Sequence, residues 1–368
     1  MPATPPPNAP LTVSVIVPVR NEEASLSDCL SSLVAQNGVV FEIIVIDDHS
    51  TDRTSEIASS FAKSGVKLIT APPLPNGWTG KNNAVAAGAK IACAEWLLFT
   101  DADTIHLPGS LARSIKEAKR QKAALLSYSP EQIVKSFWEK AAMPVIFAEL
   151  ASSYRPSQVS DPNSSAAAAN GQYILITREA YNAVGGHAAV AGNLLEDVAL
   201  ARAVKRSGRK IFFRFGGDAV RTRMYRSFAQ LREGWTKNLV LLFPQPVRLA
   251  VQRGLEFILI IAGLAITIAD AFRGHSHSAI AAATLCVILY ELFLTRIRRA
   301  HFSWNANLLA LFGLPLFSYL LIRSKLFYNR GTVSWKGRQY PGNQRSMALD
   351  KESTATMQDK HGLSHAQS

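Results

Sequence analysis

Three long apolar runs in the last third of the chain restrict most strongly how it can fold. They extend from Leu255 to Phe272, from Ser278 to Leu294 and from Asn307 to Ile322. A helix of about 20 apolar residues can span the hydrocarbon core of a bilayer. The runs are nearly free of charge, and arginines or short polar loops separate them, which favours membrane helices over three buried helices of a soluble domain. We therefore predict a membrane region with two or three apolar helices over residues 249–330.

The overall composition agrees with a membrane portion and leaves two explanations for the charge. Apolar residues make up 48% of the chain, the mean hydropathy is +0.07 and the net charge is +13. A strongly basic chain can bind nucleic acid or an anionic membrane surface. The basic residues cluster in segments 202–226, 296–299 and 323–338, and the last two flank apolar runs as juxtamembrane lipid contacts do. Since no nucleic-acid-binding motif accompanies the charge, we expect the bilayer and no nucleic acid as a partner.

Ahead of the membrane region, residues 11–248 alternate between strand-like and helix-like patterns. Four short β-branched or apolar segments are expected to be strands: Val13–Pro18, Phe41–Ile46, Val66–Thr70 and Trp96–Thr100. Segments with helical spacing separate them, and one of these carries Leu26, Leu30 and Leu33. This β-α-β-α order predicts an α/β domain with a mostly parallel, doubly wound sheet.

The two ends of the chain and the cysteines indicate a cytoplasmic setting for this domain. Residues 1–10 form a proline-rich tail without the basic start and apolar core of a signal peptide. Residues 331–368 begin basic and continue without pattern, which predicts a disordered tail. Cys29, Cys93 and Cys286 lack metal-ligand spacing and fit a reducing compartment.

An acidic pair directly follows the fourth expected strand. The apolar run Trp96–Phe99 ends in Thr100, Asp101, Ala102 and Asp103. The carboxyl ends of parallel strands form the edge at which open α/β sheets bind ligands. Mg²⁺ and Mn²⁺ take a few carboxylate oxygens together with substrate phosphates, so Asp101 and Asp103 could hold a metal-bound nucleotide diphosphate. A solvated, Asp-rich turn is the alternative.

Three further polar segments could belong to the same site, and each has a structural alternative. In the turn 47–52, acids such as Asp48 could cap helix amides or accept a hydrogen bond from a base or ribose. The Gly-rich loop 76–84 could hold a diphosphate with Lys81 and the amides of the following helix, although it lacks Walker A spacing. Glu196 and Asp197 begin a helix, where acids either offset the helix dipole or act as a base.

Taken in order, these pieces resemble the family 2 glycosyltransferases, whose catalytic domain has a GT-A nucleotide-sugar-binding fold. The resemblance extends from about Val13 to Trp235 and rests on five motifs in the family's order. They are VIVPVRNE (15–22), VIDDHSTD (45–52), GKNNA (80–84), TDAD (100–103) and GGH through ED (185–197). Three further segments, 77–81, 161–171 and 335–338, look like the membrane-bound branch associated with carotenoids and hopanoids.

The resemblance implies a role for each matching residue. Those bordering the nucleotide sugar would be Pro18, Glu22, Asp48, Lys81 and Asp101, with Lys81 near the diphosphate. Asp103 would ligate Mg²⁺ or Mn²⁺, and Asp101 would face the ribose or the metal. Asp197 would be the general base, with Glu196 beside it.

The family's acceptor motif, Gln-x-x-Arg-Trp, is only partly present. Trp235 remains, but Leu231 and Gly234 stand at the Gln and Arg positions. This departure argues against processive polysaccharide synthesis and favours a single transfer to a small lipid. Trp235, Trp335 and Arg338 are the candidates for acceptor binding or gating.

The expected function is inverting, metal-dependent transfer of a sugar from a nucleotide-diphosphate sugar to a carotenoid- or hopanoid-like membrane lipid. One direct displacement inverts the anomeric carbon, and a base removes the proton of an attacking hydroxyl. A divalent cation and Lys81 would stabilise the charge on the departing diphosphate. Two alternatives stay open: a polyprenyl-phosphate glycosyltransferase, and a catalytically inactive membrane protein that binds sugar nucleotides. The expected location is the cell membrane, multi-pass, with a cytoplasmic catalytic domain.

The third apolar run conflicts with the positive-inside tendency. With a cytoplasmic catalytic domain, three full crossings would place the basic segment 323–338 outside. Pro315 lies midway through this run and can break a helix, because it removes a backbone donor. We therefore hypothesise that residues 307–322 are re-entrant or lie at the interface, which keeps Trp335 and Arg338 on the cytoplasmic side.

Overall fold

The computed structural model of the chain describes residues 12–340. The chain divides into two compact units, one of Met1–Arg226 with Leu294–Ala310 and one of Ser227–Phe293 with Leu311–Ser368. The tail 1–10 and the part of the C-terminal tail from residue 341 lie outside the described residues, so the predictions made for them stay predictions.

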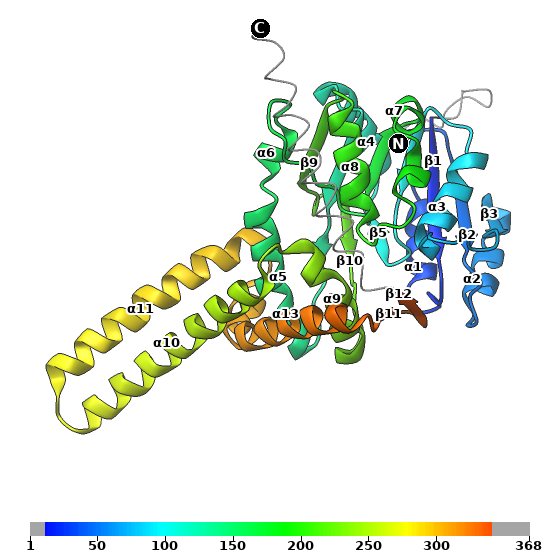
Figure 1. Cartoon of the computed structure of the whole chain (residues 1–368). Helices are drawn as coiled ribbons and strands as arrows, with labels where there is room; N and C mark the ends of the chain where they lie inside the picture. The colour runs from blue at the N-terminus through cyan, green and yellow to red at the C-terminus, as the bar shows by residue number, and fades with distance from the viewer. Residues whose placement is uncertain (1–11, 341–368) are drawn as a thin grey trace, which may run out of the picture. The chain divides into compact units, whose positions relative to one another are not determined.

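The first unit is built on a seven-stranded sheet with the order β3-β2-β1-β4-β8-β6-β9 (Figure 1). Its strands are β1 Val13–Val19, β2 Phe41–Asp47, β3 Val66–Thr70, β4 Trp96–Phe99, β6 Leu125–Ser129, β8 Ile174–Thr177 and β9 Ile211–Phe215. The first four pair in parallel, as do β6 and β9, whereas β8 runs antiparallel to both of its neighbours. The mostly parallel sheet predicted from the sequence is confirmed.

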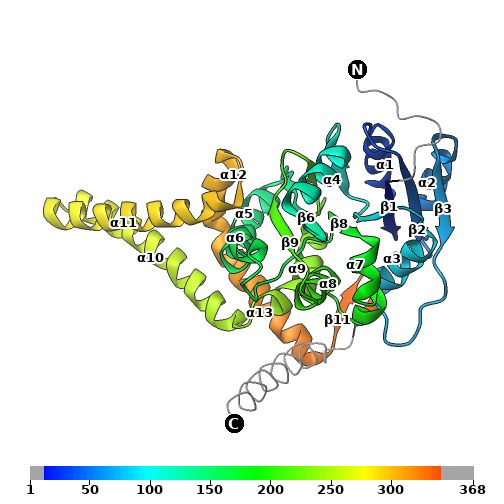
Figure 2. The same cartoon turned by 90° about the horizontal axis from the view of Figure 1, so that it is seen from above.

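Helices cover both faces of this sheet, as a doubly wound domain requires (Figure 2). They are α1 Leu26–Val34, α2 Thr54–Ser60, α3 Gly80–Ile91, α4 Ser110–Gln121, α6 Pro156–Ser160, α7 Arg178–Ala183 and α8 Glu196–Arg206, whereas α5 Phe137–Ser153 packs against α12 Trp304–Leu309. Apolar residues of α1, α2 and α4 share one core with Val15 and Leu98, and those of α3, α7 and α8 share a second with Ile16 and Leu97. Successive strand residues therefore point into different cores, which explains why these strands are apolar throughout.

A small three-stranded sheet with the order β5-β10-β7 was not expected from the sequence. Its strands are β5 Thr104–His106, β10 Val220–Thr222 and β7 Glu131–Gln132. Each is at most three residues long, so none has enough alternation to stand out from a loop. β5 begins directly after Asp103, so the turn 100–103 connects one sheet to the other.

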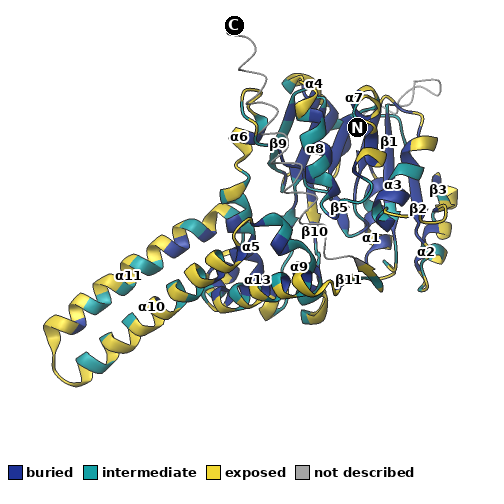
Figure 3. Cartoon of the chain, viewed as in Figure 1, coloured by how far each residue is buried: buried dark blue, intermediate teal, exposed yellow. Residues whose placement is uncertain are grey.

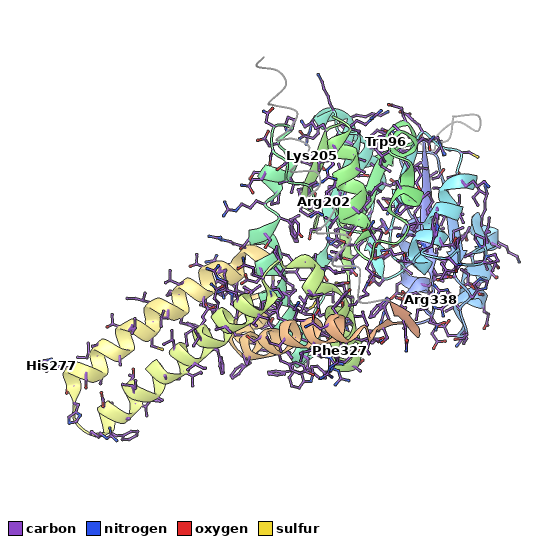
Figure 4. All side chains as sticks on the ribbon, viewed as in Figure 1. Trp96, Arg202, Lys205, His277, Phe327 and Arg338 are labelled. Atoms are coloured by element: carbon purple, nitrogen blue, oxygen red, sulfur yellow. The ribbon has the colours of Figure 1, made fainter. Side chains whose placement is uncertain are left out.

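The first of the three basic clusters is used largely within the first unit. Arg214 pairs with Glu117 and Asp218, and Arg223 pairs with Glu139. Lys205, on α8 beside Arg202 in Figure 4, donates to the backbone oxygens of Val159 and Ala166. Much of the charge in segment 202–226 is therefore structural.

The second unit contains long apolar helices whose surfaces are mostly exposed (Figure 3). Its elements are α9 Phe228–Leu242, α10 Pro246–Phe272, α11 Ser276–Ile297, α13 Gly313–Arg330, and a hairpin of β11 Val333–Trp335 with β12 Arg338–Tyr340. The last residues of α11, after Phe293, belong to the first unit. Three helices, Pro246–Phe272, Ser276–Ala300 and Trp304–Arg330, are long and apolar enough to cross a membrane. The most apolar stretches of the first two are only 6% and 17% buried within the protein, which suits a lipid environment.

The third apolar run differs from the first two. Its most apolar stretch is 44% buried, and it is divided into α12 Trp304–Leu309, a 3-10 turn Ala310–Phe312 and α13. The division precedes Pro315, which lies in the first turn of α13, where its missing N–H leaves no hydrogen bond unmade. α13 packs against α9 and α10 within the second unit.

Candidate active site

The candidate site lies where the order of the central strands changes direction. The chain passes outward from β1 through β2 to β3 and then returns to β4 on the other side of β1. A crevice forms at the carboxyl ends of strands at such a point, and open α/β sheets bind ligands there. The segments after β1, β2 and β4 are those in which the sequence placed candidate residues.

The turns after β1 and β2 are joined by motif residues. Asn21, in the left-handed region with φ 52°, accepts a hydrogen bond from the backbone nitrogen of Thr51 at 2.8 Å. Asp47 accepts one from the backbone nitrogen of Ser50 at 3.0 Å. Asp52 accepts one at 3.0 Å from the backbone nitrogen that begins α2, so the capping expected in this turn falls to Asp52.

The three residues predicted to border the base and ribose reach the same edge of the sheet. Pro18 is the penultimate residue of β1, and Asp48 follows β2 directly. Asp48 is buried, and its backbone nitrogen donates to the oxygen of Val19 at 2.8 Å. Glu22 is half-buried and accepts a hydrogen bond from Ser25 at 2.9 Å. Their contact with a nucleotide stays a prediction.

Lys81 connects the two acidic pairs of the sequence. Its ammonium lies 2.7 Å from Asp101 Oδ1 and 2.8 Å from Glu196 Oε1. Burial works against the charged ammonium, but the attraction of both carboxylates outweighs it and raises the pKa of Lys81 well above its ordinary value. The strand end and the start of α8 are thus held together by one cation.

Asp197 is oriented by two backbone donors at the start of α8. Gly171 N donates to Asp197 Oδ2 at 2.9 Å, and Val198 N donates to Asp197 Oδ1 at 2.8 Å. Burial and then the negative charge of Glu196 raise the pKa of Asp197 to about 6, although Lys81 acts in the opposite direction. A carboxylate with a raised pKa is suited to accept a proton near neutral pH.

Asp103 lies in a different environment, beside groups that stay uncharged. Gln172 Nε2 donates to Asp103 Oδ1 at 3.5 Å and to Thr222 Oγ1 at 3.1 Å. Burial, followed by the charge of Asp103, raises the pKa of both Tyr225 and Cys29. Asp103 therefore brings a negative charge close to both of these buried side chains.

The segment 170–172, before β8, joins the two acidic regions and was missed as functional from the sequence. Gly171 contacts Asp197, and Gln172 contacts Asp103. A Cβ at Gly171 would lie 3.0 Å from Lys81 Nζ and 3.5 Å from Asp197 Oδ2. The sequence predicts a strand over Gly171–Thr177, and a glycine within a strand pattern is a signal of close backbone approach that could have identified this segment.

The Gly-rich loop and the start of α3 pack on the segment that precedes α8. Asn82 is buried and donates to the backbone oxygens of Val190, Ala191 and Asn193. Thr79 N donates to Ala191 O, and Asn82 N donates to Thr79 Oγ1. Two amides of this helix start thus already have acceptors in the protein, so the predicted diphosphate contact depends mainly on Lys81.

The Gly-Gly-His motif is structural. His187 is buried, lies 3.0 Å from the Tyr181 hydroxyl through Nδ1, and has a pKa lowered to about 4 by burial. A Cβ at Gly186, which has φ 54°, would lie 2.5 Å from the Tyr181 ring. The motif therefore shapes the turn before Glu196 and Asp197.

The three acceptor candidates belong to the second unit. Trp235 is buried in α9. Trp335 and Arg338 face each other as partners in the β11–β12 hairpin, with the Lys237 ammonium 5.4 Å from the Trp335 ring. Their role at the active site stays a prediction.

The carboxylates of the site fit a hard divalent cation that also binds substrate. Within residues 12–340, no three acidic, histidine or cysteine side chains gather into a metal-binding group. Mg²⁺ is commonly bound by one or two carboxylates plus substrate phosphates, so such a group is not required. Asp103 supplies a half-buried carboxylate at the strand end, and Asp101 is the second available oxygen donor.

Comparison with known proteins agrees with the fold. The family described as glycosyl transferase family 2 matches residues 14–185. The 4,4'-diaponeurosporenoate glycosyltransferase of Staphylococcus aureus (strain USA300) is 30% identical over 344 residues, which cover 89% of this chain and 88% of the relative. A mannosyltransferase from Pyrobaculum calidifontis, solved with GDP-Man and Mn²⁺, shares the fold with a TM-score of 0.51 and 17% identity over 88% of each chain.

A doubly wound sheet with acidic residues after the carboxyl end of β4 and at the start of α8 therefore defines the general class of this protein. The chain belongs to the family 2 glycosyltransferases and has their GT-A fold. The resemblance inferred from the five motifs is confirmed, as is the assignment as a glycosyltransferase.

Proposed function

We propose that this protein transfers a sugar from a nucleotide-diphosphate sugar to a carotenoid-like lipid at the membrane. The main structural support is the bridge from Asp101 through Lys81 to Glu196, because it holds Asp197 beside the strand end that would carry the diphosphate. The lipid acceptor is supported by the relative named for 4,4'-diaponeurosporenoate and by the apolar helices that follow the catalytic domain.

The transfer is one displacement. The acceptor oxygen forms a bond to the anomeric carbon while the bond from that carbon to the diphosphate oxygen breaks, and the electron pair leaves with the diphosphate. Asp197 accepts the proton of an attacking hydroxyl, since its raised pKa brings it close to the working pH. A carboxylate acceptor would need no base. One displacement inverts the anomeric configuration.

Asp103, with Asp101, would hold Mg²⁺ or Mn²⁺ against the two phosphates. When bound, the metal would supply positive charge to the departing diphosphate. Lys81 adds a second cation near the same place and fixes the position of Asp101. Pro18, Glu22 and Asp48 would border the base and ribose.

The experiment that tests this function is analysis of lipids from a host that makes carotenoid acids. Expression of the full chain should add a species heavier by one sugar residue, and a host without carotenoids should show none. Transfer to polyprenyl phosphate in both hosts would replace the acceptor assignment. Nucleotide-sugar binding without any new lipid in either host would favour the inactive binding protein.

We also propose a cytoplasmic catalytic domain followed by two full crossings and a third run that does not cross. The third run is more buried and is divided, which supports this topology. In a chain with Cys93 replaced by serine, a Ser334→Cys variant should resist a membrane-impermeant thiol reagent in intact cells. A Ser276→Cys variant, at the exposed first residue of α11, should be labelled as the matched control. Labelling of both positions would show three crossings.

A further inference from the structure

A second pocket, separate from the acidic site, lies entirely within the first unit. It has a volume of about 440 Å³, and Glu131, Phe215, Arg298, His301, Trp304 and Asn307 are among its lining residues. None of these side chains has a role in the transfer proposed above. Most of the lining comes from residues 298–307, which comprise the segment that connects α11 to α12 and the start of α12.

The wall formed by this segment is cationic and aromatic. The Arg298 guanidinium lies 4.9 Å from the Trp304 ring, and the His301 ring stacks on Phe215 at 4.2 Å. The wall's carboxylate, Glu131, is paired with Arg221 at 2.6 Å. Because that pair cancels its charge, the pocket retains the positive charge of Arg298 and attracts an anion.

The pocket also contains a buried acceptor that needs a donor. Asn307 is only 3% exposed, and its Nδ2 donates to Phe302 O at 3.1 Å. That bond fixes which end of the amide is the oxygen, and Asn307 Oδ1 has no hydrogen-bond partner in the described part of the chain. Buried acceptors are nearly always satisfied, so a hydroxyl or ammonium of a ligand is expected there.

The position of the pocket in the chain indicates where such a ligand comes from. Arg298 lies near the end of the second candidate membrane span, Ser276–Ala300, and Trp304 is the first residue of the third. Tryptophan and arginine at the ends of membrane helices lie at headgroup depth. Arg296, two residues earlier, is paired with Glu149 and is structural.

We propose that this pocket binds the headgroup of an anionic phospholipid of the phosphatidylglycerol type. Arg298 and His301 contact the phosphate, and Asn307 Oδ1 accepts a hydrogen bond from a headgroup hydroxyl. The inference depends on the membrane insertion proposed above and is independent of the transfer reaction. The bound lipid ties the connecting segment of the first unit to the membrane surface.

The test is titration of the purified full-length protein in detergent with dioctanoyl phosphatidylglycerol, followed by native mass spectrometry. Arg298→Gln should weaken binding at least about tenfold, the usual worth of a charge-assisted contact. Arg299→Gln is the matched control, because Arg299 is an equally exposed neighbour outside the pocket lining and should change binding little. Equal losses in both variants would indicate general surface attraction and overturn the proposal.

Two further arms test the identity of the ligand. Asn307→Leu should reduce the affinity for phosphatidylglycerol to that for dioctanoyl phosphatidic acid, which lacks the headgroup hydroxyl. If glycerol 3-phosphate displaces the lipid at the same concentrations at which the lipid itself binds, the site is one for a soluble phosphate, and the lipid assignment is overturned. Lipid transfer activity and thermal unfolding of Arg298→Gln should stay at wild-type values, which separates loss of this site from loss of the fold or of the reaction.

Discussion

The two acidic pairs of this enzyme are similar in sequence and differ in what the structure does with their members. Asp101 and Asp103 follow β4, and Glu196 and Asp197 begin α8. In each pair one carboxylate, Asp101 or Glu196, is paired with Lys81. The other member, Asp197 or Asp103, contacts the segment 170–172. On the function proposed above, one acid of each pair would position the site, and the other, Asp103 or Asp197, would hold the metal or accept the proton.

The shared cation explains why the two positioning acids can lie so close together. Two carboxylates around one site repel each other unless a cation lies between them. Burial of charged groups offsets much of their mutual attraction, so we expect Lys81 to contribute more to the arrangement of the site than to the free energy of unfolding. Substitutions in each pair should therefore affect catalysis unequally.

The largest effect is expected for Asp103→Ala. Loss of the proposed metal ligand should lower turnover by at least about 10³, with little effect on thermal unfolding, because the half-buried carboxylate lies at a strand end. Turnover should be measured over a range of Mn²⁺ concentrations. Asp28→Ala, on the exposed surface of α1, is the control and should keep full activity. Wild-type rates in Asp103→Ala at ordinary Mn²⁺ would reject the assignment.

Asp197→Asn should lower the catalytic rate by roughly 10² to 10⁴ with a hydroxyl acceptor, while binding of the nucleotide sugar stays near normal. Its pKa is raised to about 6, so the wild-type carboxyl becomes protonated as the pH falls through that value. The wild-type rate should therefore decline below about pH 6, and the variant should lose this limb. If binding collapses while the rate at saturation survives, Asp197 is a ligand contact and not the base.

Lys81→Met should have a smaller effect, a loss of about 10 to 10², since the metal proposed at Asp103 would still supply positive charge to the diphosphate. It should also change the pH profile in a predictable direction. Lys81 lowers the pKa of Asp197, so its removal should shift the acid limb to higher pH. Lys81→Arg keeps the charge and should return the limb toward its wild-type position. An unchanged limb in Lys81→Met would show that the bridge does not influence the base.

Much of the fold could be predicted from the sequence, because β1 to β4 are β-branched or apolar runs buried in two cores. The acids at their ends were identified for the same reason, since the end of a buried strand is a local signal. The reversed β8 and the short strands β5, β7 and β10 depend on pairing between distant segments, which no local pattern records.

The contacts within the site could not be predicted from local sequence patterns either. Lys81 was expected near a diphosphate, but its contact with Glu196 joins residues from opposite ends of the domain. No motif indicated that Gly171 and Gln172 contact the two acidic pairs. Their importance comes from the side chains that folding brings beside them.

The smallest effect is expected for Gly171→Ala, which tests whether the two pairs are coupled through Lys81. The added Cβ would lie 3.0 Å from Lys81 Nζ, so the ammonium must shift by a few tenths of an ångström, while Gly171 N can still donate to Asp197. A displacement of that size should lower the catalytic rate about two- to fivefold. In the Lys81→Met background the methyl group no longer meets an ammonium. The same substitution should then leave the catalytic rate almost unchanged. An undiminished loss in that background would place the crowding at Glu196 or Asp197 and remove Lys81 as the link between the pairs.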